Sequence, residues 1–394
     1  MSESVTRPWR TLEFKLLIAW LLVVLVTIFA DENRSYLRYP GACAQEVLRQ
    51  TILLGIVALG SSVIIISGGI DLASGSTIAL SSTLFAGFML VLDPTGFRDP
   101  SVPLTGGTVA LAAGAALLGG ALVGTFHTWL ITRIGLPPFV ATLSTLVGLR
   151  SMARGLAKLF TDSGQINLSE AWVKELLTSP WTLIIIFVVL VLIFWILMSR
   201  TVWGRQLHAL GGNETAAVLS GIRTDKLKWL AYCLGSLCAS LMGLLFLGET
   251  SAAKPESDAL GFELNAIAAA VIGGCNLRGG IGTIPGTMLG CLFLSTVIDA
   301  IGRIIGTDSK VYEGLIVGIV VVFAVTFSQR SSQVKQYFSG ALGWATIPFL
   351  GLLVGTVSMF FYKNAPVAVS LGAVTMLAAA GRGVWEIRSS RQAA

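Results

Sequence analysis

The chain alternates long apolar runs with short polar segments. Runs of about twenty apolar residues are long enough to cross a bilayer as helices. We expect such helices at residues 15–31, 50–67, 72–93, 104–131, 138–158, 181–199, 229–248, 263–275, 284–303, 311–328, 341–361 and 365–382. No stretch shows the period of two that a membrane β-barrel requires. The pattern predicts an all-α polytopic membrane protein, with about ten core transmembrane helices and two additional C-terminal helices.

Two apolar runs are interrupted by glycine-rich segments, "SGGIDLASGS" at 67–76 and "IGGCNLRGGIGTIPG" at 272–286. Aligning residues 68–75 with 273–280 gives identity at four of eight positions and places Asp71 opposite Asn276. We interpret this as an internal repeat of broken helices. Chance similarity between glycine-rich loops is the alternative. The residues expected to form the breaks or a gate are Gly68, Gly69, Asp71, Gly75, Gly273, Gly274, Asn276, Gly279 and Gly280. A plain loop carboxylate is the other interpretation of Asp71.

Composition supports the membrane assignment. Hydrophobic residues make up 54% of the chain and charged residues 12%, with a mean hydropathy of +0.80. The net charge of +6 comes without a basic block, which argues against nucleic acid as a partner. Fifteen of the 27 Lys and Arg residues fall in alternate loops and nine in the others. The positive-inside rule then predicts a multi-pass protein of the cell (inner) membrane with both termini cytoplasmic. The N-terminal run resembles a signal peptide, but we interpret it as an uncleaved first span.

The chain offers little catalytic or cofactor chemistry. Its five cysteines have no C-x-x-C spacing and are expected to be small buried apolar residues. Two histidines are too few for a zinc site. No G-x-x-x-x-G-K-[ST] motif occurs, so we expect no ATP site of the P-loop type. The sequence predicts that this chain is not an enzyme, and that it binds no metal or cofactor.

The longest segment assigned to the inner side, residues 200–228, contains a predicted short helix. Asn213 can cap it, Glu214 suits its first turn, and Gly221 can end it. We expect its small residues to face outward, where another protein could approach closely. A plain amphipathic connector on the membrane surface is the alternative.

Three basic residues lie four apart in the span at 138–158 and so share one helical face: Arg150, Arg154 and Lys158. We expect their side chains to extend to the outer headgroups beyond an early end of the span. The alternative is a basic face near the outer mouth that meets another protein.

Three sequence segments together resemble the permease subunits of ribose-type sugar ABC importers. They are "SGGIDLASGSTIAL", "GRQLHALGGNETAAVLSGI" and "GFELNAIAAAVIGGCNLRGGIGTIPGT". The similarity covers roughly residues 50–328. It implies a permease domain at 1–335 and a C-terminal extension at 336–394 that the family usually lacks.

The resemblance also implies partners and roles. In that family the second segment is the coupling helix that docks into the ATPase subunit. Here this corresponds to Gly211, Gly212, Asn213, Glu214, Ala216, Ala217, Ser220 and Gly221. The implied partners are a second permease copy, ABC ATPase subunits that bind ATP and Mg, an extracytoplasmic sugar-binding protein and membrane lipid.

The leading hypothesis is therefore the transmembrane subunit of an ATP-driven importer for a monosaccharide or similar small polyol. Glu263 and Asn265 open the span at 263–275 and are the candidate residues of the translocation path. The alternative is a gradient-driven secondary transporter, although such carriers often keep several carboxylates within their spans. An intramembrane enzyme is disfavoured, because no acid–base or nucleophile–base set occurs.

Overall fold

The fold is described from a computed structural model of the chain. The described residues are 12–98, 102–305, 314, 318, 340–362 and 365–393. The chain divides into two compact units, residues 1–326 and 327–394. Each unit is described by itself below.

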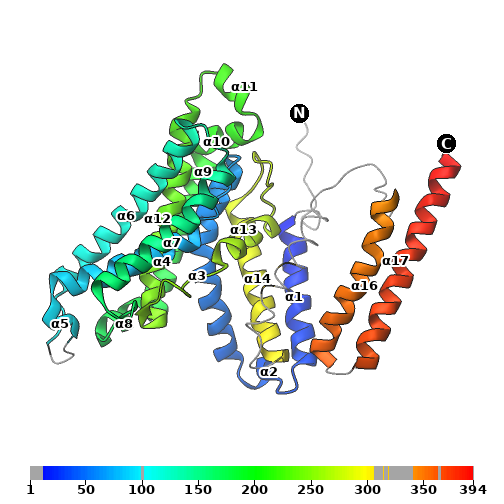
Figure 1. Ribbon diagram of the computed structural model, residues 1–394, viewed down its shortest axis with the longest axis horizontal. Helices are drawn as coiled ribbons and strands as arrows, with labels where there is room; N and C mark the ends of the chain where they lie inside the picture. Colours follow the sequence, from blue (N-terminus) through cyan, green and yellow to red (C-terminus); the bar gives the residue numbers. More distant parts are fainter. Residues whose placement is uncertain are drawn as a thin grey trace. The chain divides into compact units, whose positions relative to one another are not determined.

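The described residues of the first unit form helices almost throughout (Figure 1). They are α1 (Leu12–Ala30), α2 (Ser35–Arg38), α3 (Pro40–Ile66), α4 (Ser74–Leu92), α5 (Pro94–Arg98), α6 (Gly106–Thr132), α7 (Pro138–Phe160), α8 (Ala171–Thr178), α9 (Pro180–Arg200), α10 (Val202–Gly212), α11 (Glu214–Leu219), α12 (Thr224–Thr250), α13 (Phe262–Ile272) and α14 (Ile284–Ile305). One antiparallel pair of two-residue strands, β1 (Ile166–Asn167) and β2 (Ala252–Ala253), joins two loops.

Within the described residues, seven helices are long and apolar enough to cross a membrane: α1, α3, α4, α6, α9, α12 and α14. This confirms the predicted all-α polytopic class. The expected span at 138–158 is also a helix, α7, and the expected span at 263–275 is the short α13. The expected span at 311–328 lies outside the described residues except for Gly314 and Gly318.

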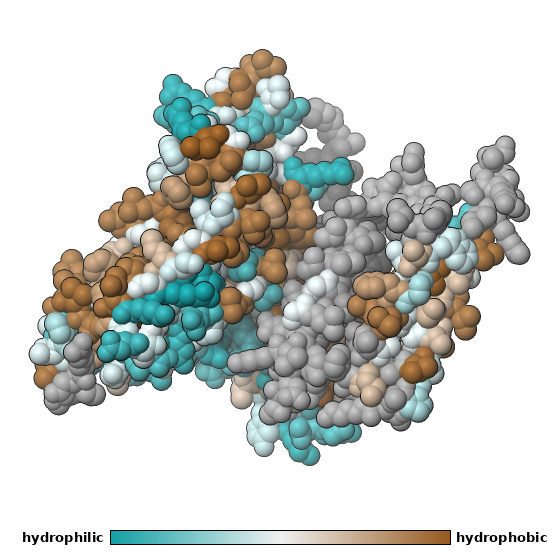
Figure 2. Space-filling view, viewed as in Figure 1, coloured by the Kyte–Doolittle hydropathy of each residue, from teal (hydrophilic) through white to brown (hydrophobic). Residues whose placement is uncertain are grey.

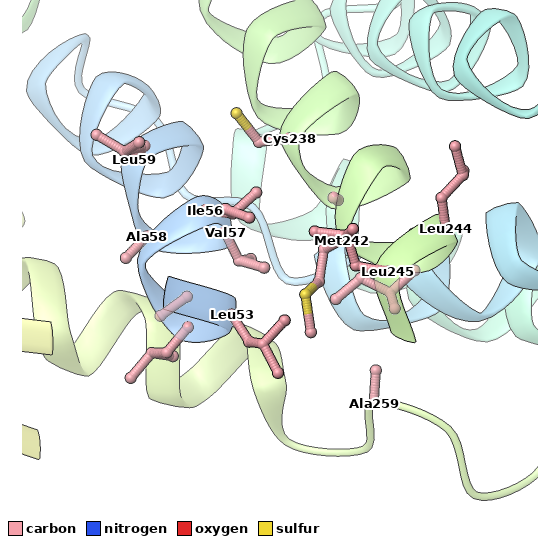
Figure 3. Close-up of a cluster of buried hydrophobic side chains, with 14 of the residues drawn as sticks. Leu53, Ile56, Val57, Ala58, Leu59, Cys238, Met242, Leu244, Leu245 and Ala259 are labelled. Carbon is pink, nitrogen blue, oxygen red and sulfur yellow. The ribbon is translucent and has the colours of Figure 1, made fainter. Parts of the chain in front are cut away.

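Helices α3 and α12 form the centre of the first unit. Leu53, Ile56 and Val57 of α3 lie close to Met242 and Leu245 of α12 in one buried cluster (Figure 3). Helices α1 and α9, in contrast, bury few of their apolar side chains. Hydrophobic residues also cover much of the surface around α6, whereas hydrophilic residues gather near α11 (Figure 2). An outward-facing apolar surface is what lipid contact requires.

The second unit contains two antiparallel helices, α16 (Gly340–Tyr362) and α17 (Ala365–Ala393) (Figure 1). They approach closely at small residues. A Cβ on Gly372 would lie 2.6 Å from the Gly351 carbonyl oxygen and 3.3 Å from the Cα of Gly355, the two ends of a G-x-x-x-G motif. Small residues at four-residue spacing let helix backbones meet without lipid between them. The two expected C-terminal helices are thus present and pack on each other.

Candidate functional site

The short helix predicted in the loop after α9 is present as α11, and it protrudes at one end of the first unit (Figure 1). Oδ1 of Asn213 accepts a hydrogen bond from the backbone N–H of Ala216 at 3.0 Å, which caps the helix start. Gly221 follows the helix with a φ of 79°, a conformation that favours glycine. The predicted cap, helix and stop are all confirmed as structure.

The exposed face of α11 is more apolar than expected. Ala217 is buried against the rest of the unit, so it does not face outward as predicted. Ala216 and Ser220 are exposed, and so are the larger Val218 and Leu219, which are 52% and 84% exposed. Such an apolar tip on a protruding helix is a surface suited to a groove on another protein.

A salt bridge connects α11 to a central helix. Nζ of Lys228, on α12, lies 2.6 Å from Oε1 of Glu214. Glu214 also stands in the first turn of α11, where a negative charge is favoured by the helix dipole. The orientation of α11 is therefore tied to the helix that forms the centre of the unit.

The first predicted break separates α3 from α4. The N–H groups of Gly68 and Gly69 donate to the carbonyls of Ile65 and Ile64, both at 2.9 Å, and Gly68 has a φ of 86°. This is the hydrogen-bond pattern that ends many helices at a left-handed glycine. Asp71 is buried, and its Oδ1 accepts from the N–H of Ala73 at 2.8 Å. Asp71 thus closes the turn that leads into α4.

The second predicted break separates α13 from α14 and repeats these features. The N–H groups of Gly274 and Cys275 donate to Val271 and Ala270, both at 2.9 Å, and Gly274 has a φ of 98°. Oδ1 of Asn276 accepts from the N–H of Arg278 at 3.0 Å, the same local turn that Asp71 makes.

The two breaks differ in register and in burial. The turns made by Asp71 and Asn276 agree with the sequence alignment, but the helix-ending glycines are Gly68 and Gly274, one position out of that alignment. Asp71 is buried, whereas Asn276 is exposed. The breaks meet directly, because the N–H of Gly280 donates to the carbonyl of Ile66 at 2.9 Å.

The candidate path residue Glu263 stands in the first turn of α13, and its carboxylate lies against the start of α4, the helix that follows the first break. A Cβ placed on Gly75, in the first turn of α4, would collide with Oε2 of Glu263. The carboxylate therefore sits at a helix N-terminus, where negative charge is stabilised. Asn265, two residues further along α13, is half-buried. The structure thus joins Glu263 to the first break, and a path role for Glu263 and for Asn265 stays a prediction.

Arg150 corrects the expectation for the basic face of α7. It is 8% exposed and does not extend to a headgroup. Its guanidinium donates to the carbonyls of Pro255 and Asp258, at 3.0 and 2.8 Å, and to Oγ of Ser76 at 3.3 Å. Helix α7 also continues to Phe160 rather than ending early, and only Arg154 and Lys158 are exposed.

Polar residues that the sequence analysis missed surround the first break. The carbonyl of Ile70 accepts from the hydroxyls of Thr142 and Tyr232, at 3.2 and 3.4 Å. Nε2 of the buried His127 is 2.7 Å from Oγ1 of Thr145, and the His127 ring packs edge-on against Tyr232. Three helices thereby hold this segment. A histidine inside a predicted span was the available signal.

Asp258, in the loop between α12 and α13, provides a test of pH dependence. Burial raises the pKa of its carboxyl group from 3.8 to about 6. The folded state then binds this proton more tightly than the unfolded chain does. The free energy of unfolding therefore falls as the pH rises from about 4 to about 6. We expect Asp258→Asn to flatten this fall and to raise the melting temperature at pH 7.

The measurement is a thermal melt of the purified protein between pH 4 and pH 8. Asp162→Asn is the matched control, because Asp162 is also a loop aspartate but is exposed. A variant of Asp258 that follows the wild-type curve would show that this carboxyl group does not control the fall.

No described residues form a metal site, since no group of three or more His, Cys, Asp or Glu side chains occurs among them. All five cysteines are free and buried, as predicted. The described residues therefore form a protruding helix, two helix breaks in contact and a buried polar shell around the first of them.

Comparison with known proteins agrees with this arrangement. The family model described as "Branched-chain amino acid transport system / permease component" matches residues 43–325. The ribose import permease RbsC of Bacillus subtilis is 32% identical over 321 residues, which covers 79% of this chain and 91% of that protein. RbsC of Escherichia coli K12 is 31% identical over 337 residues, 82% of this chain and 96% of that protein.

Other relatives are named for the transport of other sugars. The D-allose transport system permease AlsC of Escherichia coli is 28% identical, covering 80% of this chain and 91% of that protein. No solved structure matches the chain. The family description names amino acids, whereas these relatives are named for sugars. The chain belongs to the BPD_transp_2 family of transport-system permease components, with ribose-type sugar permeases of ABC importers as its relatives.

Proposed function

We propose that this chain forms the translocation pathway of an ATP-driven importer for a monosaccharide or similar small polyol. The carrying observation is α11, a capped helix that protrudes from the unit and exposes Val218 and Leu219. The names of the relatives support the substrate class: they import ribose, allose or fructose. In this proposal the protein that delivers the substrate determines which sugar is transported, and uptake assays identify that sugar.

In this proposal α11 is the coupling helix. Its apolar tip enters a groove of a separate ATPase subunit, which binds ATP and Mg and supplies the energy. Two copies of the permease, or this chain and a related one, enclose the pathway, and an extracytoplasmic binding protein delivers the sugar. The chain lies in the cell membrane with both termini and α11 on the cytoplasmic side.

The breaks supply the flexible backbone that alternating access needs. Irregular backbone at membrane depth is tolerated where protein or a wet cavity surrounds it. The first break meets that condition, because the hydroxyls of Thr142 and Tyr232 satisfy the Ile70 carbonyl and Asp71 is buried. Movement of these segments relative to the fixed core would open the pathway alternately to each side.

The test is retention of the ATPase by the membrane-embedded permease. Leu219→Asp places a charge in the proposed apolar contact, and we expect loss of at least about 90% of the co-purified ATPase, because a buried unpaired charge is strongly disfavoured. Radiolabelled D-ribose uptake by intact cells should fall with it.

Leu159→Asp is the matched control. Leu159 is 83% exposed, close to the 84% of Leu219, but it lies at the end of α7. Full ATPase retention by Leu219→Asp would remove α11 from the coupling role. Uptake that persists without ATP but fails when ion gradients are collapsed would instead favour a secondary transporter.

A further inference from the structure

The end of α10, the helix that leads into α11, packs directly on both breaks. The carbonyl of Ile66, the last residue of α3, accepts the N–H of Gly280 from the second break at 2.9 Å. Nδ1 of His208, on α10, lies 3.0 Å from the carbonyl of Gly280. A carbonyl can only accept, so Nδ1 of His208 carries the proton and donates. One glycine of the second break is thus bonded to α3 on one side and to α10 on the other.

There is no room for side chains in this contact. A Cβ on Gly211 would collide with the Ile66 carbonyl and would lie 2.5 Å from the N of Gly280. A Cβ on Gly279 would lie 2.9 Å from the Cα atoms of both Gly211 and Gly68. We call these contacts of Gly68, Gly211, Gly279 and Gly280, with the Ile66 carbonyl and His208, the backbone junction.

A backbone-to-backbone contact of this kind passes a displacement of one segment directly to the next. Close-packed interiors have low compressibility, and here no flexible side chain lies between the segments. Helix α10 continues through Asn213 into α11, which the Glu214–Lys228 salt bridge also holds to α12. A shift of α11 must therefore move the end of α3 and the second break together, or break the junction.

We propose that the backbone junction is the mechanical link between the coupling helix and the two breaks, and that Gly211 and His208 are positioning residues for transport. This inference rests on the proposed function and adds the route by which ATPase movement reaches the pathway. A junction of purely local structural importance would instead affect assembly, ATP hydrolysis and uptake in parallel.

The experiment compares Gly211→Ala with Gly148→Ala in the assembled transporter. Both glycines lie within helices, but Gly148 belongs to α7, is exposed and has nothing within 4 Å of an added Cβ, so the second variant is the matched control. ATPase co-purification and ATP hydrolysis are measured in proteoliposomes with the binding protein. Uptake of radiolabelled D-ribose, D-allose and D-fructose is measured in the same vesicles.

We expect Gly211→Ala to retain the ATPase and to hydrolyse ATP at the wild-type rate, but to lower sugar uptake per ATP about tenfold. A tenfold change corresponds to about 1.4 kcal/mol, which lies within the usual cost of overpacking a close contact. Gly148→Ala should match the wild type. Unchanged uptake per ATP in Gly211→Ala, or equal losses of hydrolysis and uptake, would overturn the inference.

A second pair of variants decides the matter if Gly211→Ala does not assemble. His208→Ala removes the donor, and uptake per ATP should fall about fivefold, whereas His208→Asn can place an amide N–H near the position of Nδ1 and should restore it. Equal uptake per ATP in both variants would refute the link. If the wild-type protein itself did not co-purify with the ATPase, the proposed function would be refuted instead.

Discussion

Replacing Arg150 with methionine is expected to destabilise the folded protein by about 2–6 kcal/mol, because it leaves two buried carbonyls without their donor and each such group costs about 1–3 kcal/mol. The guanidinium is 8% exposed and donates to two backbone carbonyls of the loop before α13 and to Ser76 of α4. Methionine has a similar length but no donor, so these acceptors would stay buried without a partner. The measurement is the melting temperature of the detergent-purified protein, together with its monodisperse yield.

Arg154→Met is the control, since Arg154 lies one turn further along α7 and is exposed. Its melting temperature should equal that of the wild type. Arg150→Lys should recover little, because a lysine ammonium is a point charge and cannot reproduce the planar fork of donors. If Arg150→Met had the same melting temperature as Arg154→Met, the hydrogen bonds from Arg150 to the loop would not contribute to the stability of the folded protein.

Arg150 illustrates what sequence patterns cannot reveal. Its spacing from Arg154 and Lys158 correctly predicts one helical face, but spacing alone does not say what that face meets. The partners lie 74 to 108 residues away in the chain. The folded arrangement offers three acceptors, and bonding to them replaces the expected route to the headgroups.

Features fixed by neighbouring residues were predictable. Asn213 and Gly221 define the start and end of α11 because capping depends on a few adjacent backbone groups. The glycine-rich breaks follow from the same local logic. The burial of Asp71 could not be predicted in this way. Its carboxylate is buried while Asn276 is exposed, although both residues make the same turn.

The exposed face of α11 shows where local reasoning reached its limit. The small residues of this helix were expected to face outward, yet Ala217 packs inward and Leu219 points out. A six-residue helix has less than two turns, so its sequence carries too little periodicity to define a buried face. The packing of α11 on α12 defines that face instead.

Replacing Gly60 with leucine is expected to prevent α3 and α12 from packing, at a cost of about 3 kcal/mol or more. A Cβ on Gly60 would lie 2.7 Å from the Cα of Gly235 and 3.2 Å from the Cβ of Cys238, so the two helices cross backbone to backbone. Fluorescence-detected size exclusion of the detergent extract should show aggregated rather than monodisperse protein.

Gly114→Leu is the matched control. Gly114 lies within α6, another apolar helix, but it is exposed and a Cβ there meets nothing within 4 Å. Both variants add the same apolar volume to a helix, so only the close approach differs. Lipid supplies no hydrophobic drive for helices to associate, and tight packing of this kind is what holds them together. Equal monodisperse yields from the two variants would mean that the Gly60–Gly235 crossing does not hold the centre of the first unit.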